Sequence, residues 1–119
     1  IIPKAFRPPE THLQRAERMA KPYLMRDIGG DALECVSDVV FADVHGKDGI
    51  THISPFTCMP EIMSQNIFPT MRSEHEIPIL TLIMDEQTGK AGYITRLEAF
   101  VDLMRRKKRA KLGKNKTRI

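Results

Sequence analysis

The residues best placed to do chemistry lie between positions 50 and 61, in the sequence ITHISPFTCMPE. Two isoleucines follow a glycine and the run stops at Pro55, which predicts a buried strand that ends at a loop. Pro60 suits the first turn of a helix, so Thr57 or Cys58 is expected to cap that helix. A thiol there faces unpaired backbone N–H groups and the positive end of the helix dipole, which favour the thiolate that attacks electrophiles and binds metals. A small cysteine packed beside a turn is the alternative.

Other groupings of ligating or nucleophilic side chains are less specific. Cys58 and His52 could form the thiol–base pair of a nucleophilic enzyme, although His52 lies within the strand and can point to its opposite face. A zinc site made of Cys58, His45, His52 and His75 has no recognisable spacing. Cys35 lies on the apolar face of a predicted helix, so we expect it to pack rather than to bind a ligand.

Several common chemistries are excluded by the motifs that the chain lacks. No glycine-rich segment matches the P-loop or the dinucleotide-binding fingerprint, and no Cys-x-x-Cys pair occurs. What remains is one polarised thiol, Cys58, followed along the chain by an acidic loop. One cysteine can supply one corner of a metal site but cannot hold an iron–sulfur cluster, which takes several thiolates.

Length and composition suit one small domain. The chain has 119 residues, 41% of them hydrophobic, and no run approaches the roughly 20 apolar residues of a membrane span. Two cysteines do not make a disulfide framework, so a cytoplasmic location is expected. The start, IIPK, has neither the apolar stretch of a signal peptide nor an initiator methionine, so we expect a fragment cut from a longer protein.

The basic charge is concentrated at the C-terminal end. Nine of the 19 lysines and arginines lie between residues 105 and 118, where no acid occurs, and the rest of the chain is net acidic. Residues 105–119 are therefore expected to be a solvated helix end that frays into a disordered, basic tail. Because no aromatic residue interleaves the basic run, nucleic acid is a poor candidate for its partner.

The first half of the chain reads as a lead-in followed by helices. Residues 1–10 contain three prolines and predict an extended segment, whereas residues 11–104 predict a single α/β domain. A capping box at Thr11 opens a helix that Pro22 kinks or splits. Apolar residues at three- and four-residue steps predict another helix over residues 31–46.

The second half alternates between helix and strand. Pro69 predicts that two short helices meet there, because proline is best tolerated at a helix start. Residues 77–84 are almost continuously apolar, which is typical of a strand covered on both faces. Residues 85–92 then form a flexible loop at the same sheet edge as Cys58, and a capping box over residues 95–98 opens the last helix.

This order of elements indicates an α/β fold with parallel strands joined by right-handed crossovers. We expect a small three-layer, flavodoxin-like parallel sheet with flanking helices. Two strands alone make a thin sheet. Either residues 39–44 add a strand, or missing parts of the parent chain or a second copy complete the sheet.

Four blocks of sequence carry a family resemblance: Asp48–Gly49–Ile50, PFTCMPE over residues 55–61, the run from IPIL at residues 77–80 to Asp85–Glu86, and TRLEAF over residues 95–100. Together they resemble the C-terminal region of large acyl-CoA dehydratase activase-related proteins. That region is similar in turn to 2-hydroxyacyl-CoA dehydratase subunits (2-hydroxyglutaryl-CoA dehydratase component D). The similarity covers roughly residues 27–104.

The resemblance implies a cofactor and partners. In the dehydratases a [4Fe–4S] cluster is carried by cysteines from different α/β domains, the last of them in a Cys-x-Pro-Glu-like segment ahead of an Ile-Pro strand. Cys58 falls at that position, which implies a cluster-ligand role in the full-length parent and no cluster in the isolated fragment. Glu61, Asp85 and Arg96 match recurring positions whose roles are expected to be structural.

In larger members of the family, an ATP-hydrolysing activator domain precedes this region and drives low-potential electrons into a dehydratase. The implied partners are the other domains of the parent chain and a 2-hydroxyacyl-CoA dehydratase-type protein, with a homo-oligomer left open. The chain has no nucleotide-binding motif and lacks the other cluster cysteines, so we expect neither ATPase nor dehydratase activity from it alone. Two alternatives stay open: a non-catalytic interaction or regulatory domain in which Cys58 is packed, and a thiol-redox protein that uses Cys58 alone.

Overall fold

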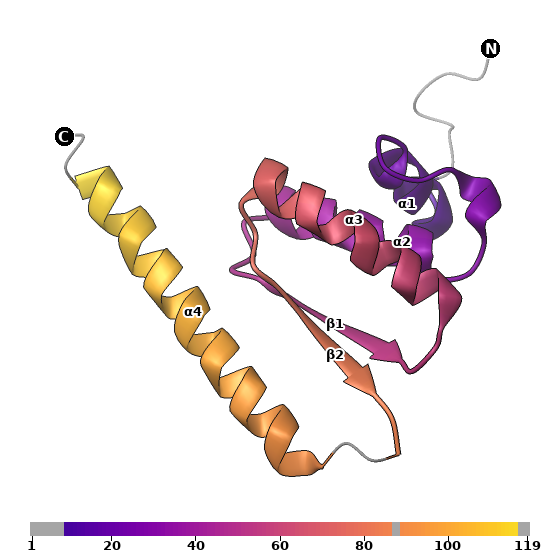
Figure 1. Cartoon of the computed structure of the whole chain (residues 1–119). Coiled ribbons are helices and arrows are strands. Elements are labelled where there is room, and N and C mark those ends of the chain that lie inside the picture. The colour runs from indigo at the N-terminus through magenta and orange to yellow at the C-terminus, as the bar shows by residue number, and fades with distance from the viewer. Residues whose placement is uncertain (1–8, 87–88, 117–119) are drawn as a thin grey trace.

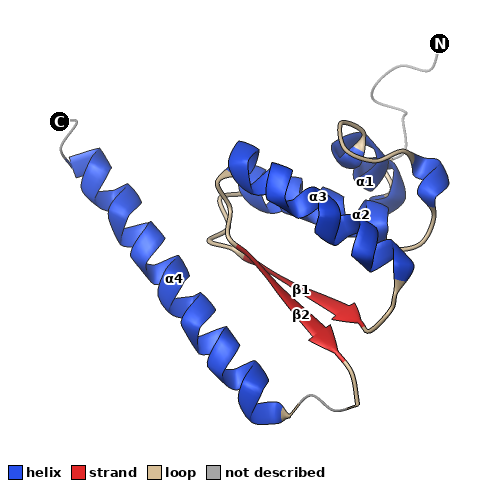
Figure 2. Ribbon diagram, in the orientation of Figure 1, coloured by secondary structure: helices blue, strands red, loops and turns tan. Residues whose placement is uncertain are grey.

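The computed structural model describes residues 9–86 and 89–116. Its elements follow one another as α1 (His12–Ala20), the 3₁₀ turn η2 (Arg26–Ile28), α2 (Ala32–Val44), β1 (Ile50–Pro55), α3 (Met59–His75), β2 (Ile79–Met84) and α4 (Lys90–Lys116). Figure 1 shows α1, α2 and α3 grouped on one side of the two strands, with α4 running along the other side. The described part of the chain is thus a small α/β domain with four α-helices and a two-stranded sheet (Figure 2).

Helices α1 and α2 form where the local signals predict them. The Thr11 hydroxyl accepts a hydrogen bond from the Gln14 backbone N–H, and the Gln14 side chain accepts one from the Thr11 N–H, which completes the capping box. Helix α1 ends at Ala20, two residues before Pro22. Helix α2 is continuous through Val44, so the alternative that residues 39–44 form a strand is wrong.

The main core lies between α1, α2, α3 and the sheet. Its buried apolar residues are Ala16, Ala20, Leu24, Ala32, Leu33, Val36, Val39, Ala42, Phe68, Met71, Ile77 and Ile79. Polar bonds at its margin tie α3 to its neighbours: the Ser64 hydroxyl lies 3.4 Å from the Ala32 carbonyl, and the Gln65 amide donates to Ser54 on β1 at 3.0 Å. Helix α3 is therefore held against both α2 and β1.

Strands β1 and β2 pair in parallel, as predicted from the alternation of elements. The register runs from Ile50 opposite Ile79 to Pro55 opposite Met84. The sheet contains only these two strands in the described part of the chain. Both strands end at the same edge, so the loop after β1, which carries Cys58, and the loop after β2 lie at that edge.

The outer edge of β2 is covered by side-chain donors. The carbonyls of Pro78 and Met84 face β1, because they accept hydrogen bonds from the N–H groups of Ile50 and Phe56. Carbonyls alternate in direction along a strand, so every second carbonyl between these two points away from β1. These outward carbonyls, at Ile79, Thr81 and Ile83, accept hydrogen bonds from Arg72, Arg96 and Tyr93 respectively. A further strand therefore has better access to the outer edge of β1 than to that of β2.

Helix α3 does not break at Pro69, so the prediction of two short helices is wrong. The helix is continuous from Met59 to His75 with Pro69 inside it. The residues on either side of the proline explain this, because Phe68 and Met71 are both buried in the main core. Pro69 itself is exposed, so its ring lies on the outer face of the helix.

Helix α4 begins earlier and extends further than predicted. It starts at Lys90, so the expected capping box at residues 95–98 lies inside the helix, where the Thr95 hydroxyl instead donates to the Ala91 carbonyl. The helix continues to Lys116, so this stretch of the basic segment is helical rather than a disordered tail. Residues 117–119, and residues 1–8 of the expected lead-in, lie outside the described residues.

Part of the basic segment fixes α4 to the body of the domain. Lys108 forms an ion pair with Asp48 at 2.7 Å, and Lys107 donates to the Glu76 carbonyl at 3.1 Å. Next to these contacts, α4 approaches Gly49 so closely that a Cβ there would lie 2.7 Å from the Met104 sulfur. No helix in the described residues combines the length and the apolar character needed to cross a bilayer.

Candidate functional site

Cys58 lies where the sequence predicts it, at the start of α3 and just after the carboxyl end of β1. It is the N-cap residue, with φ −72° and ψ 111°, and Pro60 occupies the first turn. Its side chain makes no capping hydrogen bond and is partly exposed. The first N–H groups of a helix have no partner inside the helix, so a sulfur at this position lies beside unsatisfied donors.

The turn between β1 and Cys58 is sharp and strained. Thr57 has φ 61°, in the left-handed region that β-branched residues avoid, and its hydroxyl bonds to the neighbouring Phe56 carbonyl at 2.7 Å. From the other side, the loop before α2 approaches the first turn of α3. A Cβ on Gly30 would lie only 2.6 Å from Cγ of Pro60. The start of α3 is therefore positioned by a strained residue and by a close backbone approach.

Large apolar side chains at the ends of β1 and β2 and in the first turns of α3 are exposed. Phe56 and Met59, two residues before and one residue after the cysteine, are 65% and 66% exposed. Ile62, one turn into α3, and Met84, at the end of β2, are also exposed. Exposed apolar residues gathered at one edge of a domain are typical of a contact surface.

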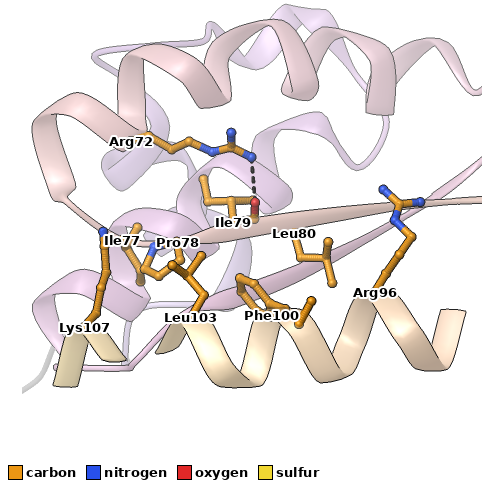
Figure 3. Close-up of a pocket in the computed structure, with 10 residues that line it drawn as sticks. Arg72, Ile77, Pro78, Ile79, Leu80, Arg96, Phe100, Leu103 and Lys107 are labelled. Atoms are coloured by element: carbon orange, nitrogen blue, oxygen red, sulfur yellow. Dashed lines mark hydrogen bonds between the residues drawn. The ribbon is translucent and has the colours of Figure 1, made fainter. Parts of the chain in front are cut away.

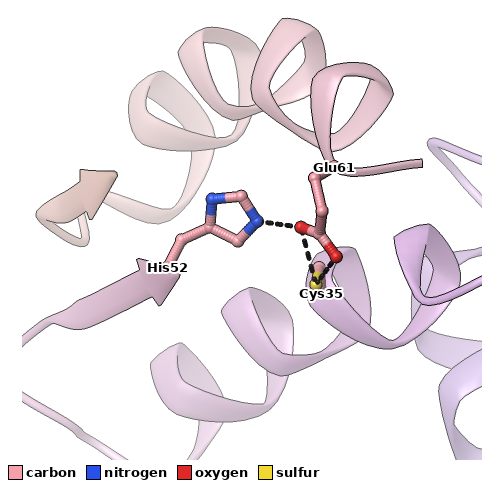
Figure 4. Close-up of side chains that lie close together, drawn as sticks. All are labelled: Cys35, His52 and Glu61. Atoms are coloured by element: carbon pink, nitrogen blue, oxygen red, sulfur yellow. Dashed lines mark hydrogen bonds and ion pairs between the residues drawn. The ribbon is translucent and has the colours of Figure 1, made fainter. Parts of the chain in front are cut away.

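A second group of functional side chains lies in the interior, between α2, β1 and α3. Cys35, His52 and Glu61 come from these three elements, and one ligand atom from each lies within 4.8 Å of the others (Figure 4). The Cys35 thiol donates to the two carboxylate oxygens of Glu61 at 3.4 and 3.6 Å. His52 Nε2 is hydrogen-bonded to Glu61 Oε2, and both side chains are buried. Because a carboxylate only accepts, this bond places a proton on Nε2.

The surroundings of Cys35 disfavour its ionised form. Burial raises the pKa of its thiol to about 12, and the negative charges of Glu61, Asp38 and Asp31 and the hydrogen bond to Glu61 act in the same direction. Glu61 lies in the first turn of α3, where the helix dipole favours a negative charge. The group therefore combines a protonated thiol with a carboxylate that is supported by its helix.

His52 is held at one nitrogen only. Its Nδ1 is buried and has no hydrogen-bond partner among the described residues. The ring meets Phe68 edge to face, with centroids 4.9 Å apart. A cavity of about 130 Å³ adjoins the ring and is lined also by Cys35 and Asp38. Buried polar atoms are usually hydrogen-bonded, so an imidazole nitrogen without a protein partner is uncommon.

The structure does not bring together the histidines and cysteine of the conceivable zinc site. The partner of His52 is Glu61 rather than Cys58. His45 bonds to the carbonyl of Phe41 in its own helix, and His75 contacts Tyr23 and Asp43. Among the described residues, the group able to hold a metal contains Cys35 instead of Cys58.

Sequence reasoning missed this group for two reasons. Cys35 follows the apolar spacing of α2 and was therefore expected to pack, and Glu61 was expected to serve only as an acid at a helix start. A first-turn glutamate usually faces solvent, but Glu61 is 5% exposed. The only local signal is the alternation in β1, which puts His52 and Ser54 on the same face of the strand.

A shallow groove of about 500 Å³ lies between β2 and α4 (Figure 3). Its floor is apolar, with Leu80, Phe100 and Leu103, and Arg72, Arg96 and Lys107 stand along it. All three of these cations already donate to backbone carbonyls. We therefore interpret them as braces between α4 and the sheet edge.

The chain is therefore an α/β domain with a pair of parallel strands. Cys58 lies at the carboxyl-terminal edge of the sheet, and Cys35, His52 and Glu61 form a second group between α2, β1 and α3. Comparison with protein-family models, with curated proteins and with solved structures gives no match to this chain.

Proposed function

We propose that this chain is the C-terminal domain of a CoA-substrate-specific enzyme activase-related, 2-hydroxyacyl-CoA dehydratase-like protein of anaerobic acyl-CoA metabolism in the cytoplasm. In this proposal Cys58 supplies one ligand to an electron-transferring [4Fe–4S] cluster, and the other ligands come from elsewhere in the parent. The observation that carries the proposal is the position of Cys58, partly exposed at the N-cap of α3 among uncovered apolar side chains.

The chemistry of the position fits one ligand of a cluster. Iron binds thiolate, and a helix start stabilises thiolate through its N–H groups and its dipole. Cys35 does not supply a second ligand beside Cys58, because its sulfur is hydrogen-bonded to Glu61 in the interior. When bound, the cluster would supply low-potential electron transfer, whereas the protein supplies one thiolate and an apolar surface that excludes water around it.

The uncovered surface fits a domain that continues elsewhere. Phe56, Met59 and Ile62 would be covered by other domains of the parent or by a dehydratase-type partner. The two strands would then belong to a three-layer, flavodoxin-like sheet, with further strands added beside β1, whose outer edge is the more accessible one.

The test uses the full-length parent, reconstituted with iron and sulfide under anaerobic conditions. Cys58→Ala is expected to lower bound iron and to remove the visible absorption of the cluster. Cys35→Ala is the matched control, because it removes the other cysteine of this domain, and it should leave bound iron unchanged. If Cys58→Ala binds as much iron as the wild type, Cys58 is not a cluster ligand and the proposal is refuted.

The two alternative functions predict different thiol behaviour. A thiol-redox protein would use Cys58 to reduce or form a mixed disulfide with a small disulfide probe, without any dependence on iron. An interaction or regulatory domain would bind its partner equally well with Cys58→Ala. The partly exposed sulfur favours the redox alternative over the packed cysteine of the second one.

A further inference from the structure

We propose that Cys35, His52 and Glu61 form a binding site for one zinc-like divalent metal ion in the interior of the domain. This site is separate from Cys58 and does not depend on the function proposed above. Its ligands come from α2, β1 and α3, three elements whose packing brings together residues that are 9 to 26 positions apart.

The spacing of the Cys35 sulfur and the Glu61 carboxylate fits tetrahedral coordination. Zinc binds sulfur at about 2.3 Å and nitrogen or oxygen at about 2.0–2.2 Å, so neighbouring ligand atoms in a tetrahedral site lie about 3.3–3.6 Å apart. The Cys35 sulfur lies 3.4 and 3.6 Å from the Glu61 oxygens. The Nε2 atom of His52 is hydrogen-bonded to the same carboxylate (Figure 4), and the imidazole would move away from the carboxylate to admit an ion. An ion between them would displace the thiol proton to solvent, and His52 would bind the ion as neutral imidazole with its proton on Nδ1 instead of Nε2.

The local charge also favours a cation. Three carboxylates, those of Glu61, Asp38 and Asp31, act on Cys35, and the described ion pairs give Glu61 no lysine or arginine as partner. These charges oppose ionisation of the thiol as long as no cation is present. A divalent ion would remove that opposition, because it neutralises the carboxylate and the thiolate together.

The site also has access to solvent and room for another ligand. The cavity of about 130 Å³ reaches Cys35 and His52, and it is lined by Asp38. A water molecule needs roughly 10–15 Å³ of such space. Three protein ligands and one open position form the arrangement of zinc sites that hold a water or a substrate atom. Thiolate and imidazole select zinc and similar ions over magnesium and calcium, which prefer oxygen ligands alone.

The test titrates the tag-free, reduced chain with Co²⁺, a probe for zinc sites whose bond to sulfur absorbs in the near ultraviolet. The wild type is expected to bind one Co²⁺ with this sulfur-to-metal band and with the intense visible bands of tetrahedral cobalt, and Zn²⁺ should displace it. Cys35→Ser should abolish the sulfur band. Glu61→Gln and His52→Gln should each weaken binding by more than the roughly 10–100-fold that loss of an outer partner costs.

Two controls make the result decisive. Cys58→Ser removes the other thiol and should leave the sulfur band and the affinity unchanged. His75→Gln removes a histidine outside the group and should do the same. Far-ultraviolet circular dichroism checks that each variant is folded. If Cys35→Ser does not fold, the affinity of Glu61→Gln, which keeps a hydrogen-bonding side chain, decides instead.

The proposal is overturned if the folded wild type shows no sulfur-to-cobalt band. It is also overturned if the band survives in Cys35→Ser or if Glu61→Gln binds Co²⁺ as tightly as the wild type. In each of these cases the three side chains form a hydrogen-bonded group without a metal. Cys58→Ser is expected to leave cobalt binding unchanged, and Cys35→Ala is expected to leave bound iron unchanged. Each assay therefore tests one of the two proposals without depending on the other.

Discussion

The buried pair of His52 and Glu61 allows a quantitative prediction. Replacing Glu61 with alanine removes the acceptor that His52 Nε2 and the Cys35 thiol have among the described residues. His52 is 5% exposed, and the cavity beside it is not lined by Glu61, so a water in that cavity does not occupy the place of the carboxylate. Glu61→Ala therefore leaves a buried donor on His52, a ring whose other nitrogen already has no partner among the described residues, and a partly buried donor on Cys35.

The magnitude follows from the cost of such donors. A buried donor without a partner costs about 1–3 kcal/mol, and breaking a buried pair by removing one member costs about 3–5 kcal/mol. Loss of a negative charge at the start of α3 adds about 0.3–1 kcal/mol. We expect Glu61→Ala to lower the free energy of unfolding by about 3–6 kcal/mol, a large part of the roughly 5–15 kcal/mol typical of a domain.

Replacing both partners should cost much less. In the double variant His52→Leu with Glu61→Leu, no polar atom of the pair is left unsatisfied. Such replacements in other proteins are neutral or stabilising. We therefore expect the double variant to be within about 1 kcal/mol of the wild type, so the two substitutions should be strongly non-additive.

The assay is urea unfolding followed by circular dichroism at pH 7, with EDTA present so that no metal contributes. Glu34→Ala is the matched control, because Glu34 is also an acid in the first turn of a helix but is only half-buried. Its cost should stay below about 1 kcal/mol. If Glu61→Ala costs no more than Glu34→Ala, the buried pair contributes no specific stability and the reasoning above is wrong.

Three further predictions concern the backbone and the thiol. In urea unfolding, Gly30→Ala should lower the free energy of unfolding by about 1–3 kcal/mol more than Gly29→Ala does. Both glycines have positive φ, but only a Cβ at Gly30 would meet the Pro60 ring, so equal costs would contradict this. Pro69→Ala should raise the thermal midpoint, since proline inside a helix costs up to about 3 kcal/mol relative to alanine; a lower midpoint would refute it. The folded protein holds the Cys35 proton up to a pKa of about 12, against an ordinary value of 9.0, so stability should fall as pH rises between these values. Cys35→Ala should show a shallower fall, and an identical pH profile would exclude this cause.

Local patterns were sufficient to predict the elements that position Cys58. The capping box of α1, the end of β1 at Pro55 and the proline in the first turn of α3 each depend on residues a few positions apart. The parallel pairing followed from the order of helix and strand. The placement of Cys58 at a helix start was therefore predictable, whereas its role as a cluster ligand stays a prediction.

The errors lie where packing between distant segments overrides a local signal. The sequence around Pro69 favours a break, but burial of Phe68 and Met71 on both sides of it keeps α3 continuous. The expected capping box at Thr95 is a good local start for a helix. Helix α4 nevertheless begins at Lys90, and the Thr95 hydroxyl bonds within that helix.

By itself, the sequence determined where α1, β1 and β2 form and that a cysteine stands at the edge of the sheet, because these properties depend on spacing along the chain. Only the tertiary structure decided that Cys35, His52 and Glu61 converge. Each of these residues follows an ordinary local pattern. They meet because α2, β1 and α3 pack together around one point, and this packing joins segments that are distant in the sequence.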